Sequence, residues 1–267
     1  MEIIGYISAL FIGLSLGLVG SGGTILTLPI FVYFFGIKDM LVATQSTLFV
    51  VGCTAFLGSL KKYSEKLVDV KTAIYFLIPS LISIYFTKGI ILPRIPNEII
   101  KTENFLLTKD TFLLVLFAFV MLFSSISMIK NSKVEDVDCF AKIPDANANH
   151  FKTTIVALIV GCLTSLVGAG GGFLIIPTLI MLKEHCMRRA IGTSLIIITV
   201  NSFISFLTDA HIPVDWELIM KITGIALIGM LIGNMLTKKI PGRKLKLIFG
   251  ITVLLLGIFI IIKELFL

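Results

Sequence analysis

The sequence has little charge. Only 15% of its 267 residues are Asp, Glu, Lys or Arg, whereas about a quarter are charged in a typical soluble domain. In contrast, 57% of the residues are hydrophobic and the mean hydropathy is +1.04. No apolar stretch has an ionisable residue near its middle, where proton relays and voltage sensors carry them. This composition indicates an integral membrane protein and leaves almost nothing for a soluble domain.

Motifs of several other function classes are missing as well. No Gly-Lys-Ser/Thr follows the glycine clusters, and neither His-Glu-x-x-His nor Gly-x-Ser-x-Gly occurs. The four cysteines form no Cys-x-x-Cys pair, and we expect them to be small buried hydrophobic residues. The net charge of +7 lies in loops beside apolar spans, not in a basic stripe. We therefore expect no enzyme, no catalytic residue, no metal, no cofactor and no nucleic-acid partner.

Eight apolar stretches can be recognised by their charged borders. A hydrocarbon core of about 30 Å needs about 20 helical residues, and six stretches fit that length. The first, Ile3–Ile37, and the fifth, Thr153–Leu182, are too long for one straight helix across a bilayer. The other six are Met40–Leu60, Val70–Leu92, Thr111–Ile129, Ala190–Thr208, Trp216–Thr237 and Leu245–Ile262.

Both over-long stretches contain the same glycine-rich phrase. Leu18-Val-Gly-Ser-Gly-Gly-Thr-Ile-Leu-Thr-Leu-Pro29 returns as Leu166-Val-Gly-Ala-Gly-Gly-Gly-Phe-Leu-Ile-Ile-Pro177, and seven of the twelve positions are identical. Glycine clusters are unfavourable inside a helix, and more so in lipid, which offers the freed backbone no hydrogen bonds. Each long stretch is therefore predicted to fold as two half-length helices joined at the glycines, as in transporters with broken helices.

The repeat extends beyond this phrase. Ala43–Leu48 aligns with Ala190–Leu195, and Val68–Val70 aligns with Val214–Trp216. The predicted fold class is an all-α polytopic membrane protein with two homologous four-segment halves, each opening with a glycine-broken or re-entrant helix hairpin. We expect the insertion near residues 97–109 to be a surface loop.

The halves are predicted to cover residues 1–130 and 152–267, with residues 131–151 as a polar linker. Each long stretch either crosses the membrane once or returns as a hairpin to its starting side. The Lys and Arg residues of the loops are divided more unevenly between the two sides of the membrane in the hairpin topology. The positive-inside bias thus favours hairpins, with both termini outside. Each half then makes an odd number of crossings, so the halves are inverted relative to each other, an arrangement that fits alternating access.

The glycine turns are the predicted substrate site. A helix that begins inside the membrane points free N–H groups and a positive dipole end at its surroundings, which suits an anion. Ser21 and Thr24 could add hydroxyl donors. The alternative is close helix packing through small residues. The glycines concerned are Gly20, Gly22, Gly23, Gly168, Gly170, Gly171 and Gly172.

Polar residues early in the next helix of each half could complete a pocket. The alternative for these hydroxyls is an ordinary helix start, or bonding to their own backbone. They are Ser46, Thr47, Thr193 and Ser194. Asn201 is read as a polar contact between helices. Asp69 and Asp215 precede apolar helices, so N-capping is preferred over proton coupling.

These residues resemble the sulfite exporter TauE/SafE family, also called the toluenesulfonate uptake permease family. The likeness rests on the doubled Leu-Val-Gly-x-Gly-Gly phrase in two four-segment halves and covers essentially the whole chain. The family consists of bacterial inner-membrane carriers for sulfite, sulfonates and related anions. The resemblance implies a multi-pass protein of the inner (plasma) membrane, with the seven glycines near the substrate. The first copy has Thr24 where the second has Gly172.

We therefore expect a permease that moves a small sulfur-containing anion, such as sulfite or an organosulfonate, by alternating access. Its expected partners are this anion and the lipid bilayer. Two alternatives remain open: an anion channel with the same site, and a non-transporting membrane subunit of a larger complex.

Overall fold

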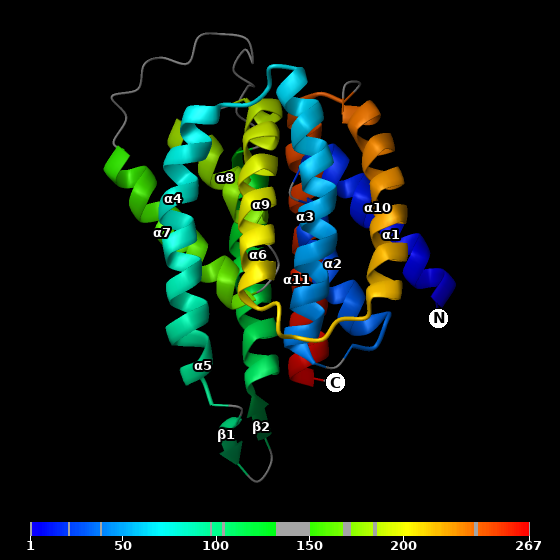
Figure 1. Cartoon of the computed structure of the whole chain (residues 1–267), viewed down its shortest axis with the longest axis vertical. Helices are drawn as coiled ribbons and strands as arrows, with labels where there is room; N and C mark the ends of the chain where they lie inside the picture. The colour runs from blue at the N-terminus through cyan, green and yellow to red at the C-terminus, as the bar shows by residue number, and fades with distance from the viewer. Residues whose placement is uncertain are drawn as a thin grey trace.

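The protein is a bundle of helices with one short β-hairpin at one end (Figure 1). The computed structural model describes residues 2–20, 22–37, 39–96, 98–102, 105–131, 150–167, 172–183, 186–237 and 240–266. Its helices are α1 (Glu2–Val19), α2 (Gly22–Tyr33), α3 (Met40–Ser64), α4 (Val70–Phe86), α5 (Leu92–Arg94), α6 (Lys109–Asn131), α7 (His150–Val167), α8 (Gly172–Lys183), α9 (Met187–Thr208), α10 (Trp216–Thr237) and α11 (Gly242–Phe266).

Both over-long stretches are broken at the glycines, as predicted. The first forms α1 and α2, and the second forms α7 and α8. In the first pair, α2 returns alongside α1, because the Tyr6 and Phe35 rings meet edge to face with centroids 6.1 Å apart. Figure 1 shows that α8 likewise runs back toward the side from which α7 started. At the first turn, Gly20 packs against Ile191 of α9 and so lies inside the bundle.

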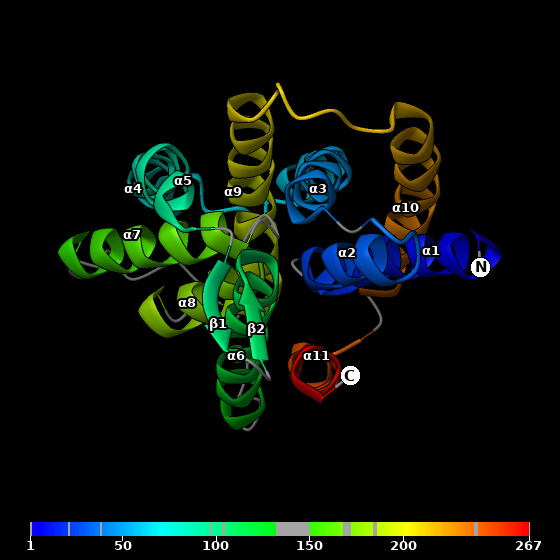
Figure 2. The same cartoon turned by 90° about the horizontal axis from the view of Figure 1, so that it is seen from below.

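The helices form three layers when viewed from below (Figure 2). One outer layer contains α4, α9, α3 and α10, and the other contains α6 and α11. The two hairpins lie between these layers, where α1 packs on α10 and α7 packs on α4. The central helices α3 and α9 pack against each other and run in opposite directions (Figure 1).

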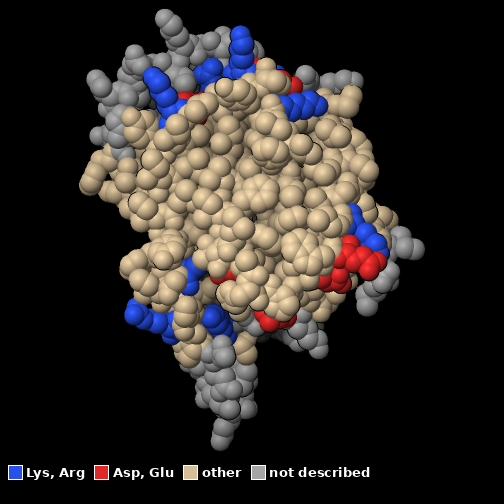
Figure 3. Space-filling model, viewed as in Figure 1, with Lys and Arg blue, Asp and Glu red and all other residues tan. Residues whose placement is uncertain are grey.

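Four helices are long and apolar enough to cross a membrane within the described part of the chain. They are Met40–Ser64, Val70–Arg94, Met187–Thr208 and Trp216–Thr237. Figure 3 shows a broad band free of charged side chains between two zones that contain Lys, Arg, Asp and Glu. Large apolar side chains such as Ile78, Phe86 and Leu231 are exposed on the outer helices. This surface is suited to contact with lipid, which supports a polytopic membrane protein.

Glycines allow the middle layer to approach the outer one closely. Gly13 on α1 faces the backbone of Ala226 on α10, and a Cβ at Gly13 would overlap the Ala226 carbonyl. Gly17 on α1 and Gly229 on α10 are equally crowded by the backbone of the partner helix. Gly161 on α7 packs against α4 in a similar way, with the Ser80 carbonyl oxygen 2.7 Å from a Cβ placed there. Small residues therefore set the distance between helices, as is common in membranes.

The insertion before α6 is a β-hairpin and not the expected loop. Strand β1 (Glu98–Thr102) pairs antiparallel with β2 (Phe105–Thr108), with Thr102 opposite Phe105. The pairing is irregular between Glu98 and Ile100. Among the described residues, the regular elements other than this hairpin are helices.

Local predictions at the helix ends are confirmed. The Asp69 side chain accepts a hydrogen bond from the Thr72 backbone N–H at 3.1 Å, and Asp215 accepts one from Leu218 at 3.1 Å. Both aspartates are therefore N-caps. Cys53 and Cys162 are free and partly buried, as expected, whereas Cys186 is disulfide-bonded, so the expectation was wrong for that residue.

Candidate functional site

The first glycine turn is defined by Gly20. Its φ of +78° lies in the left-handed region, and its N–H still donates to the Leu16 carbonyl at 2.7 Å. A Cβ at Gly20 would lie 2.6 Å from Cγ2 of Ile191 on α9. Glycine is needed here both for the backbone conformation and for this contact. Ser21 lies outside the described residues.

The start of α2 is tightly packed. Gly22 opens the helix, and a Cβ at Gly23 would lie 2.5 Å from the Ile12 carbonyl oxygen on α1. Thr24 is fully buried, and the Thr27 hydroxyl donates to the Gly23 carbonyl at 2.6 Å. At Gly20 and Gly23 the structure therefore displays the close packing that was the alternative to a ligand site.

The second glycine turn is described only at its edges. Helix α7 ends at Val167 and α8 begins at the buried Gly172. Gly168, Gly170 and Gly171 lie outside the described residues. The last turn of α7, with Thr164 and Ser165, brings buried hydroxyl groups to this place.

The four predicted hydroxyl residues are buried, but their hydrogen bonds differ. Ser46 donates to the Val42 carbonyl at 2.8 Å, and Ser194 donates to Ile191 at 2.9 Å. Both bond their own helix, which was the alternative reading. Thr193 Oγ1 accepts the Asp69 backbone N–H at 3.0 Å and so links α9 to the chain just before α4. Within the described residues, the buried Thr47 hydroxyl has no hydrogen-bond partner.

Lys88 is a buried charged residue near the end of the apolar stretch Val70–Leu92. It lies in a π-helical turn, η1 (Thr87–Ile91), which continues α4 without a break, and its side chain is 3% exposed. Its Nζ donates to the Ser205 carbonyl at 2.9 Å and forms an ion pair with the Asp209 carboxylate. Asp209 is the residue that ends α9. Isolated π-turns inside helices often occur at functional sites.

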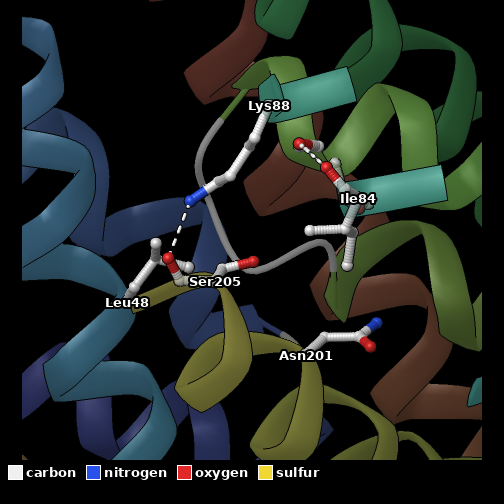
Figure 4. A pocket seen from close by; sticks show the side chains of 7 residues that line it. Leu48, Ile84, Lys88, Asn201 and Ser205 are labelled. Atoms are coloured by element: carbon white, nitrogen blue, oxygen red, sulfur yellow. Dashed lines mark hydrogen bonds between the residues drawn. The ribbon is translucent and has the colours of Figure 1, made fainter. Parts of the chain in front are cut away.

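Lys88 borders a small cavity between α3, α4, α7 and α9 (Figure 4). Its volume is about 10 Å³, about what one water molecule needs. The Asn201 amide reaches it from α9, where its oxygen also accepts the Ser80 hydroxyl at 3.3 Å. This contact confirms Asn201 as a polar link between helices. The lining consists of Leu48, Ile84, Lys88, Thr164, Ser165, Asn201 and Ser205.

The arrangement is suited to an anion. A buried ammonium, hydroxyl groups and an amide converge where α7 leads into the second glycine turn. Charged residues within a membrane-spanning segment are costly and usually functional. Among the described residues, no three His, Cys, Asp or Glu side chains come together as a metal site would require.

A second buried lysine behaves differently. Lys62, near the end of α3, forms an ion pair with Glu65 at 3.3 Å, three residues further along the same helix end. Lys88 instead reaches Asp209, which is 121 residues away in the sequence. The sequence signal for Lys88 was its position inside the apolar stretch Val70–Leu92, but its partner could not be read from spacing.

Comparison with known proteins identifies the family. The sequence model of the family described as sulfite exporter TauE/SafE matches residues 6–260. The chain belongs to the TauE/SafE family. It is a membrane transporter of that family rather than an enzyme, as the names of the family and of its relatives indicate.

The relatives of this TauE/SafE protein are aligned over nearly their whole length. A "probable membrane transporter protein" of Xylella fastidiosa is 26% identical over 94% of this chain and 91% of its own. One from Methanocaldococcus jannaschii is 26% identical over 97% and 94%. The "probable membrane transporter protein YunE" of Bacillus subtilis is 23% identical over 98% and 99%. No solved structure matches the chain.

Proposed function

We propose that this TauE/SafE protein is a secondary transporter of the plasma membrane that moves a small sulfur-containing anion, such as sulfite or an organosulfonate, by alternating access. The observation that carries the proposal is the buried Lys88 ammonium, which borders the same small cavity as the last turn of α7. The family description supports the sulfur-containing substrate. A small oxyanion would accept hydrogen bonds from Lys88. The Thr164 and Ser165 hydroxyls, which donate to the Gly161 and Ile84 carbonyls at 3.0 and 3.5 Å, would turn from these carbonyls to the anion.

The glycine turns have a supporting role in this proposal. Helix α8 begins at Gly172, the last glycine of the second glycine phrase, and its first N–H groups have no partner within the helix. Together with Lys88 they would give the anion backbone donors and one full positive charge. The first turn, packed at Gly20 and Gly23, would act mainly by allowing α1 and α2 to move as one body.

Alternating access would use the two halves as inverted repeats, residues 1–130 and 152–267. Their opposite directions support this idea, since α3 and α9 run antiparallel. The contacts support it too: α1 packs on α10 as α7 packs on α4. The start of each central helix also meets the end of the other. Gln45 Nε2 donates to the Phe206 carbonyl at 2.7 Å, and Gly192 packs against the Leu67 carbonyl.

The size of the cavity supports a carrier. About 10 Å³ cannot hold an oxyanion with several heavy atoms, so a solute enters only when helices separate. A channel would instead need a continuous open path in its conducting state.

Transport by purified protein in proteoliposomes tests the proposal. We expect radiolabelled sulfite to enter vesicles containing the wild-type protein, and Lys88→Gln to lower the rate by more than about tenfold, because a hydrogen bond to a charged group contributes about 1.5–3 kcal/mol. Lys71→Gln is the matched control, because Lys71 is exposed near the start of the same helix. The double variant Lys88→Gln with Asp209→Asn removes both charges, and we expect it to be inactive as well. Wild-type flux in folded Lys88→Gln would contradict the proposal.

A further inference from the structure

Asp209 neutralises Lys88 in the structure, since the two side chains form an ion pair. The two side chains come from different halves of the bundle, Lys88 from the end of α4 and Asp209 from the end of α9. Lys88 is almost completely buried, whereas the Asp209 side chain is 19% exposed. Gln45 on α3 donates from Nε2 to the Asp209 carbonyl at 3.0 Å and so holds the backbone of this residue in place.

An ammonium group at this depth needs a negative partner. Removing one member of a buried ion pair is strongly destabilising, because the remaining charge is uncompensated. A carrier must rearrange both when loaded and when empty in order to move substrate in one direction. The loaded protein would have the substrate anion beside Lys88, but the empty protein has no such partner unless its own chain supplies one.

We propose that Asp209 is the counter-ion of the empty carrier, which the substrate anion displaces on binding and which returns to Lys88 when the anion leaves. This inference rests on the proposed function and names a further residue of the same site. The partial exposure of Asp209 lets its carboxylate turn to water when displaced, whereas Lys88 stays buried. The charge of Lys88 is thereby compensated in both states, and the empty carrier can reorient.

The inference predicts different results for two kinds of transport, net flux and exchange. Net flux requires the empty carrier to reorient, whereas exchange of labelled for unlabelled anion across the membrane uses the loaded carrier alone. In Asp209→Asn the empty carrier has an uncompensated Lys88. We therefore expect net sulfite flux into empty vesicles to fall by more than about tenfold, as expected for a broken buried pair. Exchange in vesicles preloaded with sulfite should continue at close to the wild-type rate.

Two variants serve as comparisons. Asp209→Glu keeps the carboxylate and should restore most of the net flux. Asp215→Asn removes an exposed carboxylate from the same connection, where it caps α10, and should change neither mode of transport. Loss of both modes in folded Asp209→Asn would overturn the inference, and so would unchanged net flux. Failure of the proposed function has a different result, because Lys88→Gln would then retain both modes.

A measurement on the wild-type protein tests the inference even if Asp209→Asn does not fold. A water-soluble carbodiimide modifies accessible carboxylates, and mass spectrometry can follow Asp209 and the exposed Glu217 in one sample. Saturating sulfite should raise the labelling of Asp209 relative to Glu217, because the carboxylate is released from Lys88. The ratio also corrects for reagent consumed by sulfite. An unchanged or lower ratio would overturn the inference.

Discussion

The ends of α4 and α10 differ in charge at corresponding positions. Both helices begin directly after a Val-Asp pair, and Lys88 and Asn234 lie the same number of residues beyond their starts. Lys88 borders a cavity next to the last turn of α7. Asn234 lies where α10 packs on the last turn of α1, and a Cβ at Gly17 would come within 2.7 Å of the Asn234 backbone nitrogen. The same architecture thus has a charged site in one half and a packed contact in the other.

The two contacts also differ in packing. On the Asn234 side, the Met230 side chain occupies the space beside Gly58 of α3, and α1 and α10 interlock through glycines. On the Lys88 side, Ser205 and Asn201 of α9 border the open volume, and α4 is widened by the π-turn. A cavity lined by polar groups can admit water or an anion, whereas a packed glycine contact transmits movement. We infer that the second glycine turn takes part in binding the anion. The first glycine turn instead couples the movement of α1 to that of α10.

The largest effect is expected at the α1–α10 contact. Gly13→Ala would force a methyl group into the Ala226 carbonyl, so we expect the unfolding free energy in detergent to fall by about 3 kcal/mol, the upper end for overpacking. Gly161→Ala at the α7–α4 contact, where the nearest oxygen is 2.7 Å away, should cost less. The measurement is equilibrium unfolding of the purified protein.

Gly224→Ala provides the control for this series. Gly224 lies on α10, but no atom of another described element lies within 4 Å of a Cβ placed there. We expect it to be neutral or to stabilise by about 0.4–1 kcal/mol, since alanine restricts the unfolded chain. If Gly13→Ala is as stable as Gly224→Ala, the two helices are not held at the distance that the glycines set.

Predictions that depend on neighbouring residues were borne out. The glycine break followed from the length of each stretch and from the repeated phrase, and both long stretches are indeed divided. The caps at Asp69 and Asp215 followed from their positions just before apolar runs. In each case the physical cause, backbone freedom or an unpaired N–H group, acts within a few residues and is visible in the sequence.

The features that were missed depend on distant residues. Lys88 lies close to the end of an apolar stretch, where a lysine is usually a loop residue, and only Asp209 on another helix shows that it is buried and paired. Among the predicted hydroxyl residues, Thr193 and Ser46 have equivalent positions in the repeat, yet one bonds across the bundle and the other bonds its own helix. Sequence repeats give the position of a side chain but not its partner.

A second, smaller effect is expected at Asn234. Among the described residues, both polar atoms of its buried amide lack a hydrogen-bond partner, which costs about 1–3 kcal/mol. Asn234→Leu is similar in size and removes these groups, so we expect the unfolding free energy to rise by up to about 1–3 kcal/mol with sulfite flux unchanged. Lys88→Leu should instead abolish flux. Loss of flux in Asn234→Leu would show that the two positions have equivalent roles.

The smallest effect is expected from the paired hydroxyl residues. In Thr193→Val the Asp69 backbone N–H loses its acceptor, and we expect a cost of about 1 kcal/mol. Ser46→Ala removes only a bond to its own helix at Val42 and should be close to neutral. Thermal unfolding of the two variants, measured side by side in the same detergent, compares them directly. If Ser46→Ala lowers the unfolding temperature more than Thr193→Val does, the prediction is contradicted, and the hydroxyl of the first half is the more important one.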